Sequence, residues 1–382
     1  MKPSDTTSAL AICGAGPVGM ALAGLLVRRG MAASGIALID ARSLSSAITD
    51  PRSIALSYGS QMLLEEIGAW PLPATAIHEI HISRRGYFGR SMMTREEQDV
   101  PALGYVTRYG ELVSALSLAV ERAGVRVLRP ARVTGHLEHA GGVSLGMEDG
   151  SAIEATLVVQ AEGGVFGQQE SKAVTRDYQQ SAIIARVSAS APIAHRAYER
   201  FTSEGPLALL PQSGPDGHQY ALVWCAQPAT VERLLALDDR DFLAQLGQAF
   251  GTRLGRFTAC SARTSYQLGL NAEPKATART VAIGNAAQTL HPVAGQGLNL
   301  GLRDAAVLAR LLAQEISPAS LGRFTAAREA DRRMTVGLTD AMARVFANHG
   351  PSQALLGLSL GILDTVAPAR TLLAEIMMFG RR

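Results

Sequence analysis

The sequence is poor in cysteine, which argues against disulfide scaffolds and cysteine-ligated metal sites. Its three cysteines, Cys13, Cys225 and Cys260, lie far apart, and none belongs to a CxxC motif or a zinc-ligand spacing. Buried, reduced thiols in a cytosolic protein are therefore expected. No other group of metal-ligating residues stands out, so we expect no metal.

An excess of charge of one sign is lacking too. The net charge is +3, and the arginines are scattered, with no run longer than a doublet such as 84–85, 332–333 or 381–382. Because a nucleic-acid surface needs a concentrated basic patch, no nucleic-acid partner is expected. Aromatic residues make up only 5% of the chain, whereas 47% of residues are hydrophobic and 38 are glycines. That composition is typical of a globular α/β protein with tight turns, and 382 residues fit two domains.

Long hydrophobic runs are almost absent. Residues 9–27 carry no charge, but Gly14, Gly16, Pro17 and Gly19 interrupt them and a βαβ pattern follows. We therefore read this run as neither a transmembrane helix nor a signal sequence, and no other run is long enough to span a bilayer. The expected location is the cytoplasm, either in solution or at the inner face of a membrane.

The same run contains a dinucleotide-binding pattern. A short strand at 9–13 precedes GxGxxG, a helix extends to about Arg29, and a second strand ends in Asp40. Glycines let the backbone approach a pyrophosphate, the helix start favours its negative charge, and the terminal acid can bind ribose hydroxyls. The residues expected at this site are Gly14, Gly16, Pro17, Gly19 and Asp40.

Four segments give a resemblance to a known family. They are "GAGPVGMALA" at 14–23, "DYQQSAIIARV" at 177–187, "YERFTSEGPLALLP" at 198–211 and "VAIGNAAQTLHPVAGQGLNLGLRDA" at 281–305. Together they resemble the class A FAD-dependent aromatic monooxygenases, and among them the ubiquinone-biosynthesis hydroxylases of the 2-polyprenyl-6-methoxyphenol hydroxylase type. The middle two segments are specific to the ubiquinone branch.

The resemblance implies an α/β fold with a Rossmann-like FAD-binding domain of the para-hydroxybenzoate hydroxylase type, an inserted β-sheet substrate domain and C-terminal helices. The expected FAD-binding domain comprises residues 1–74, 101–172 and 276–345. The expected substrate domain comprises 75–100 and 173–275, and a helical region covers 346–382. Within the first domain, "MEDGSAIEA" predicts a hairpin with an Asp149-Gly150 turn.

The segment at 281–305 is implied to face the flavin. A helix start near Gly297 would direct free N–H groups at the negative pyrimidine edge, and glycines would keep side chains from blocking that approach. The residues expected at the reaction centre are Pro292, Gly295 and Gln296. Those expected to contact FAD here are Gly284, Asn285, Gly297, Leu298 and Asn299.

Two arginines and one acid complete the implied FAD site. Arg52 is expected to open the helix after the second strand and Arg108 to open a later helix, both holding FAD oxygens. Glu162 occupies the place of the family's third-fingerprint Asp, and Asn285 replaces the Asp of the ribitol site. A neutral acceptor at 285 loses about 1 kcal/mol relative to a charged one, or about tenfold in affinity.

The implied activity is hydroxylation of the aromatic ring of a polyprenylated phenol in ubiquinone biosynthesis, by O2 through a flavin C4a-hydroperoxide. Electrons would come from NAD(P)H or a separate reductase. Two alternatives remain open: an FAD-dependent reductase or dehydrogenase of the same fold, and a non-catalytic scaffold subunit of a ubiquinone-biosynthesis complex.

Several residues allow two interpretations. His291 either shapes its loop or acts as an acid-base group, and Tyr220, Trp224 and Gln212 either line the pocket or, for the two aromatics, belong to the core. The apolar runs "SQALLGLSLGILD" and "TLLAEIMMFGRR" predict helices packed on the body, or a surface that contacts a membrane or a partner protein.

Overall fold

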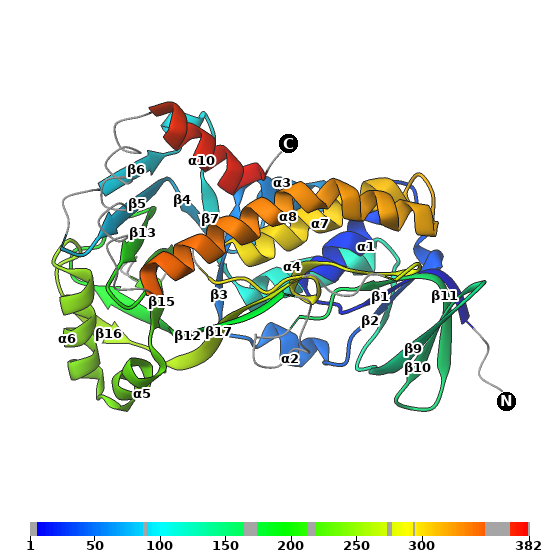
Figure 1. Cartoon of the computed structure of the whole chain (residues 1–382), viewed down its shortest axis with the longest axis horizontal. Helices are drawn as coiled ribbons and strands as arrows, with labels where there is room; N and C mark the ends of the chain where they lie inside the picture. The colour runs from blue at the N-terminus through cyan, green and yellow to red at the C-terminus, as the bar shows by residue number, and fades with distance from the viewer. Residues whose placement is uncertain are drawn as a thin grey trace.

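A computed structural model describes residues 6–86, 90–163, 174–212, 219–272, 277–292, 295–347 and 367–380 (Figure 1). Two large β-sheets lie at opposite ends of the elongated molecule, and the long helix α8 (Pro318–Ala347) extends along it. Among the described helices, none is both long and apolar enough to cross a membrane.

The first sheet has seven strands within the described residues, in the order β8-β2-β1-β11-β10-β9, with β18 also paired to β11. Strands β8, β2, β1, β11 and β18 are parallel. The strands are β1 (Thr6–Cys13), β2 (Ile36–Ile39), β8 (Arg126–Leu128), β9 (Val133–His139), β10 (Gly142–Met147), β11 (Ala152–Gln160) and β18 (Thr280–Ala282). The predicted hairpin is confirmed, because β10 and β11 pair antiparallel around the Asp149-Gly150 turn.

Residues 9–27 are a buried strand and helix of this domain. They divide between β1 and α1 (Pro17–Arg28), and Leu10, Ile12, Leu22 and Leu25 are fully buried. Burying each such side chain stabilises the fold by about 1.5–3 kcal/mol, which explains why the run carries no charge. The other helices of this part are α2 (Leu44–Ile48), α3 (Tyr58–Glu66), α4 (Tyr109–Arg122) and α7 (Gln296–Leu312).

The second sheet has eight strands within the described residues, in the order β16-β12-β15-β14-β13-β5-β6, with β17 also paired to β12. They are β5 (Glu79–Arg84), β6 (Arg90–Thr94), β12 (Val174–Ala189), β13 (Arg196–Phe201), β14 (Pro206–Gln212), β15 (Gln219–Ala226), β16 (Phe257–Cys260) and β17 (Thr264–Ala272). We propose residues 75–100 and 173–275 as the substrate domain, since they contain every strand of this sheet.

A smaller described sheet has the order β3-β7-β4. Its strands are β3 (Ser53–Ser57), β7 (Gly104–Arg108) and β4 (Ala74–Ile77).

Helices α5 (Pro228–Ala236) and α6 (Asp239–Phe250) cover one face of the second sheet. Tyr220 and Trp224 point to this face and pack in one core with Phe242 and Leu246. Of the two interpretations of these aromatics, the core role is confirmed, because strand alternation directs them to the helix-covered side. The Tyr220 hydroxyl donates to the Ile193 carbonyl at 3.1 Å, which satisfies it within the core.

The C-terminal helix α10 (Ala367–Phe379) packs on the body beside α3 and β6 (Figure 1). Ala374 and Met378 are buried together with Met93 and Leu103. The prediction of a packed helix in the second apolar tail run is confirmed. The first run, at 352–364, lies outside the described residues.

A buried network of charged side chains joins α8 to α7. The Asp304 carboxylate accepts from Arg328 Nε at 2.8 Å, from Arg332 NH2 at 2.8 Å and from Gln288 Nε2 at 3.2 Å. Burial alone would raise the pKa of Asp304, but the two arginines outweigh it and lower the pKa below its ordinary value. The charged carboxylate therefore stabilises the fold at neutral pH, and this stability is lost as the pH falls through the lowered pKa.

Asp304→Ala is expected to lower the free energy of unfolding by about 3–5 kcal/mol, because it removes the fully buried anion that the largely buried guanidinium groups of Arg328 and Arg332 share. Urea denaturation measures this value. Glu329→Ala is the control: it breaks the exposed pair with Arg333 and should cost less than about 1 kcal/mol. Equal losses in the two variants would contradict the assignment.

Candidate cofactor and substrate site

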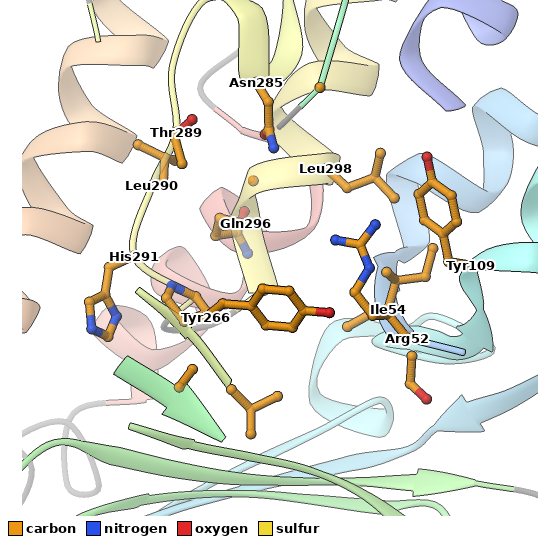
Figure 2. Close-up of a pocket in the computed structure, with 18 of the residues that line it drawn as sticks. Arg52, Ile54, Tyr109, Tyr266, Asn285, Thr289, Leu290, His291, Gln296 and Leu298 are labelled. Carbon is orange, nitrogen blue, oxygen red and sulfur yellow. The ribbon is translucent and has the colours of Figure 1, made fainter. Parts of the chain in front are cut away.

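A cavity of about 970 Å³ is lined by strands of the second sheet, by the loops that follow β1, β2 and β11 of the first sheet, by the start of α7 and by α10. Figure 2 shows part of its lining. One end is formed by the β1–α1 turn and the residues after β2, and it is polar. The other end is walled by the second sheet and is mainly apolar. Such a continuous cavity has room for an elongated cofactor and a substrate side by side.

The polar end has the features of a nucleotide site. Gly14, Gly16, Pro17 and Asp40 all line it, as the sequence predicts. Asp40 is held in place because its two carboxylate oxygens accept from the backbone N–H groups of Ala15 and Arg42, each at 2.8 Å. No side chain caps the start of α1, so its first N–H groups are available to an anionic ligand.

The glycines of this motif have two different roles. A Cβ on Gly14 would lie 2.6 Å from the backbone of Ala161, and one on Gly19 only 1.9 Å from the Gly14 carbonyl oxygen. Gly19 does not line the cavity. Its lack of a side chain allows α1 to pack closely against the end of β1. A Cβ on Gly16 would meet only the Tyr109 hydroxyl at 3.6 Å, so this glycine leaves space for a ligand.

The start of α7 is the second uncapped helix end at the cavity. Gly295 precedes the helix in the left-handed conformation, with φ of 60°, and no side chain caps it. The nearest atom to a Cβ on Gly297 would be Asn285 Oδ1 at 4.0 Å, so that position is open. Figure 2 shows Asn285, Gln296 and Leu298 around this opening. Residues 293–294 lie outside the described residues.

Asn299 and Gly284 are not among the cavity-lining residues, contrary to expectation. The Asn299 Oδ1 accepts from Ser57 N at 2.8 Å and from Ser60 Oγ at 2.7 Å. Its Nδ2 donates to the carbonyls of Gly295 at 2.8 Å and Ala55 at 3.1 Å. Asn299 therefore ties the start of α7 to β3 and α3 and positions the residues that do line the cavity.

The two predicted arginines are placed differently from each other. Arg52 lines the cavity, but it precedes strand β3, so the expectation that it opens a helix is wrong. Its guanidinium pairs with Asp50 at 2.7 Å and lies 5.0 Å from the ring centre of Tyr109. Arg108 does immediately precede α4, yet its side chain is exposed and does not line the cavity. Its neighbour Tyr109 occupies that part of the wall.

Glu162 lines the polar end, near Asp40. Burial and the negative charge of Asp40 both raise the pKa of Glu162. Arg129 and Arg42 each lie 3.8 Å from Asp40 and offset part of this negative charge.

His291 and Pro292 line the cavity next to the second sheet. The His291 Nε2 lies 3.0 Å from Gln180 Oε1, and the Tyr178 ring packs edge-on against the imidazole. Burial lowers the pKa of His291 to about 4, so the ring is neutral at physiological pH. With Nε2 bonded to an amide oxygen, the ring is an N–H donor that fixes its loop, which favours the structural interpretation.

Sequence reasoning missed several lining residues. They are Tyr109, Tyr266 and Glu199, together with Ile376 and Met377 of α10. Figure 2 shows Tyr266 and Arg52 pointing toward each other across the cavity. Gln212, a predicted lining residue, instead donates to Ser53 Oγ and is absent from the wall. Strand alternation in "RAYERF" could have identified Glu199 as cavity-facing, once the face covered by α5 and α6 was known.

These observations fit FAD. The starts of α1 and α7 have no side-chain cap, and both face the same cavity. The start of α1 lies near the Asp40 carboxylate, and the start of α7 includes the unobstructed backbone of Gly297. We propose that the nucleotide end holds the adenosine and pyrophosphate and that Gly297 and Leu298 approach the flavin ring. Their N–H groups would stabilise negative charge on the reduced ring.

Gly297→Val is expected to abolish FAD retention while the protein still folds, because the added side chain enters the cavity rather than the core. The flavin absorbance per mole of purified protein measures this. Gly247→Val is the matched control, since a Cβ there, in α6, meets no atom within 4 Å. A normal flavin content in the Gly297 variant would refute the proposed approach of α7 to the ring.

Comparison with known proteins assigns the chain to a family. The FAD binding domain family matches residues 6–339. The ubiquinone hydroxylase UbiL of Rhodospirillum rubrum is 33% identical over 97% of this chain and 89% of its own length. The 3-demethoxyubiquinol 3-hydroxylase of Escherichia coli is 28% identical over 90% of each chain.

Solved structures agree on the fold. The p-nitrophenol 4-monooxygenase PnpA of Pseudomonas putida superposes with a TM-score of 0.77 at 15% identity, covering 98% of this chain and 99% of its own. The predicted α/β fold of the para-hydroxybenzoate hydroxylase type is thereby confirmed. With FAD as its cofactor, the chain belongs to the FAD-dependent monooxygenase family that includes the ubiquinone hydroxylases.

Proposed function

We propose that this protein hydroxylates the aromatic ring of a polyprenylated phenol in ubiquinone biosynthesis. The observation that carries the proposal is the continuity of one cavity from the nucleotide end to an apolar chamber. The apolar wall of that chamber includes Ile77, Ile80, Ile82, Leu210 and Leu268. A chamber of this kind suits a prenylated ring. The two relatives by sequence named above are both called hydroxylases, and both names refer to ubiquinone compounds.

The reduced flavin supplies the activation of O2 and the electron pair. The protein's own residues bind, orient and exclude water. Asp40 and the start of α1 hold the nucleotide, and Asn299 keeps the start of α7 in position. Pro292, Gly295 and Gln296 lie where the glycine loop meets the chamber, so we assign them to the reaction centre.

FAD bound in this cavity would need a source of electrons. We propose NAD(P)H or a separate reductase as the electron donor. Glu162 stands where the family's Asp is implicated in pyridine-nucleotide contact, and burial and Asp40 raise its pKa. The flavin-free scaffold alternative is disfavoured, because the site retains the groups needed to hold FAD.

Oxygen transfer is testable without knowledge of the donor. FAD-loaded protein, reduced chemically and mixed with ¹⁸O2 and a short-chain prenylphenol, is expected to yield a hydroxylated ring carrying one ¹⁸O, detected by mass spectrometry. Free reduced FAD and the Gly297→Val protein serve as controls and should give no product. Complete absence of ¹⁸O product across a set of prenylphenols would rule out the proposed activity.

We further propose that α10 contacts the membrane that holds the prenyl chain. Ile376 and Met377 line the cavity, while Leu372 on the same helix is 57% exposed. Met62, on the neighbouring α3, is 49% exposed. An apolar surface next to an apolar chamber fits entry of a lipid substrate from a bilayer. The same surface is the candidate contact with other proteins of a ubiquinone-biosynthesis complex.

Leu372→Glu is expected to reduce binding to phosphatidylcholine–phosphatidylglycerol vesicles severalfold in a flotation assay, because it places a charge on the contacting surface. Leu137→Glu is the matched control, since Leu137 on β9 is 69% exposed and lies in the other sheet. Equal vesicle binding by the two variants would contradict membrane contact through α10 and favour a protein partner.

A further inference from the structure

Glu199 is a carboxylate in the wall of the apolar chamber. It lies on β13, where Ala197, Glu199 and Phe201 line the cavity. The other charged residues of the lining are at the nucleotide end: Asp40, Arg42, Asp50, Arg52, Arg132 and Glu162.

The residues in line with Glu199 across the cavity face of the sheet are apolar. Strand pairing places Ile82 of β5 on one side and Ala208 of β14 on the other, followed by Val223 of β15 and Ile184 of β12. All four of these residues line the cavity. Directly opposed side chains lie about 4.5–5.5 Å apart between Cβ atoms, so none of these neighbours offers the carboxylate a hydrogen bond.

Burial and the nearby Glu199 carboxylate raise the pKa of the Cys225 thiol, which lies on the same face of the sheet. Across the described residues, no arginine or lysine neutralises Glu199, and burial alone raises its pKa to about 7. An acid without a partner in an apolar wall costs free energy, which a ligand that donates a hydrogen bond would recover. Groups of this kind gather at functional sites.

We propose that Glu199 accepts a hydrogen bond from a hydroxyl on the substrate ring and restricts the chamber to neutral phenols, excluding aromatic acids. This rests on the proposed function. An ionised ring carboxylate would bring a second negative charge into a chamber wall where the described residues provide no cation, and like charges at close range repel strongly in a desolvated site. A phenol hydroxyl carries no charge at neutral pH and supplies the missing donor.

The geometry also orients the ring. Ala208 lies opposite Glu199 on β14, and Ala197 lies two residues before it on β13. Both line the chamber, and their small side chains let a ring approach the carboxylate closely. The apolar residues farther along the wall, including Ile77 and Ile80, would then receive the prenyl chain. Glu199 thus acts as a specificity-determining residue that sets which edge of the ring faces it.

Binding to the oxidised, FAD-loaded protein tests this assignment independently of turnover. The ligands are 2-prenylphenol, its methyl ether, which cannot donate a hydrogen bond, and 3-prenyl-4-hydroxybenzoate, which adds the carboxylate. Isothermal titration calorimetry gives the three dissociation constants. The natural protein is expected to bind the phenol at least about 10-fold more tightly than either of the other two, since hydrogen bonds to charged groups are among the stronger ones.

Two variants separate the charge from the hydrogen bond. Glu199→Gln keeps an acceptor oxygen but removes the charge, so it should bind the hydroxybenzoate about 10-fold more tightly than the natural protein does while retaining the phenol. Glu199→Leu should lose the preference for the phenol over its methyl ether. Glu232→Gln, an exposed change on α5, is the control that removes the same charge away from the cavity and should change none of the constants.

Flavin content confirms that each variant is folded, and the near-isosteric glutamine variant keeps the test valid if the leucine variant fails to fold. Unchanged ligand preferences in folded Glu199 variants would overturn the proposal, as would a natural protein that does not prefer the phenol. If these preferences appear but no ¹⁸O is transferred, the hydroxylase assignment fails and the binding role of Glu199 stands.

Discussion

The close approach of α1 and α7 is the contact on which the site depends. A Cβ on Gly301 of α7 would lie 2.8 Å from Val18 of α1 and 3.0 Å from the Gly284 backbone, so only bare backbone fits there. Gly284 itself adopts a positive φ of 59°. This glycine contact sets the starts of the two helices beside the same cavity. Each leaves N–H groups without a side-chain cap, and together they provide two places for negative charge along one extended cofactor.

The sequence predicted the elements that depend on local pattern. The β1–α1 motif, Asp40 after β2, the β10–β11 hairpin and the glycine-rich start of α7 all follow from spacing and glycine placement, and the structure contains them. The family resemblance added FAD and the second sheet, which short strands alone do not identify. Fold class could therefore be predicted with few errors, because each of these signals lies within one short stretch of the chain.

The errors concern residues whose roles depend on the distant part of the chain they meet. Arg52 precedes a strand because β3 pairs with β7, more than 45 residues away. Asn299 bonds to Ser57, 242 residues distant, so no local pattern shows that it supports the cavity wall without lining it. Tyr220 and Trp224 alternate as predicted, but which face α5 and α6 cover is decided only by tertiary packing.

The packing of Gly59 links the C-terminal tail to the cofactor loop. A Cβ on Gly59 would lie 2.6 Å from the Met378 carbonyl oxygen, so α3 and α10 touch backbone to backbone with no side chain between them to absorb movement. One residue along, Ser60 bonds to Asn299, which in turn bonds to Gly295. Three successive contacts therefore connect α10 to the start of α7: Gly59 with Met378, Ser60 with Asn299, and Asn299 with Gly295. Because each step is a direct contact, a shift of α10, which also lines the chamber, would be expected to alter the position of Gly295.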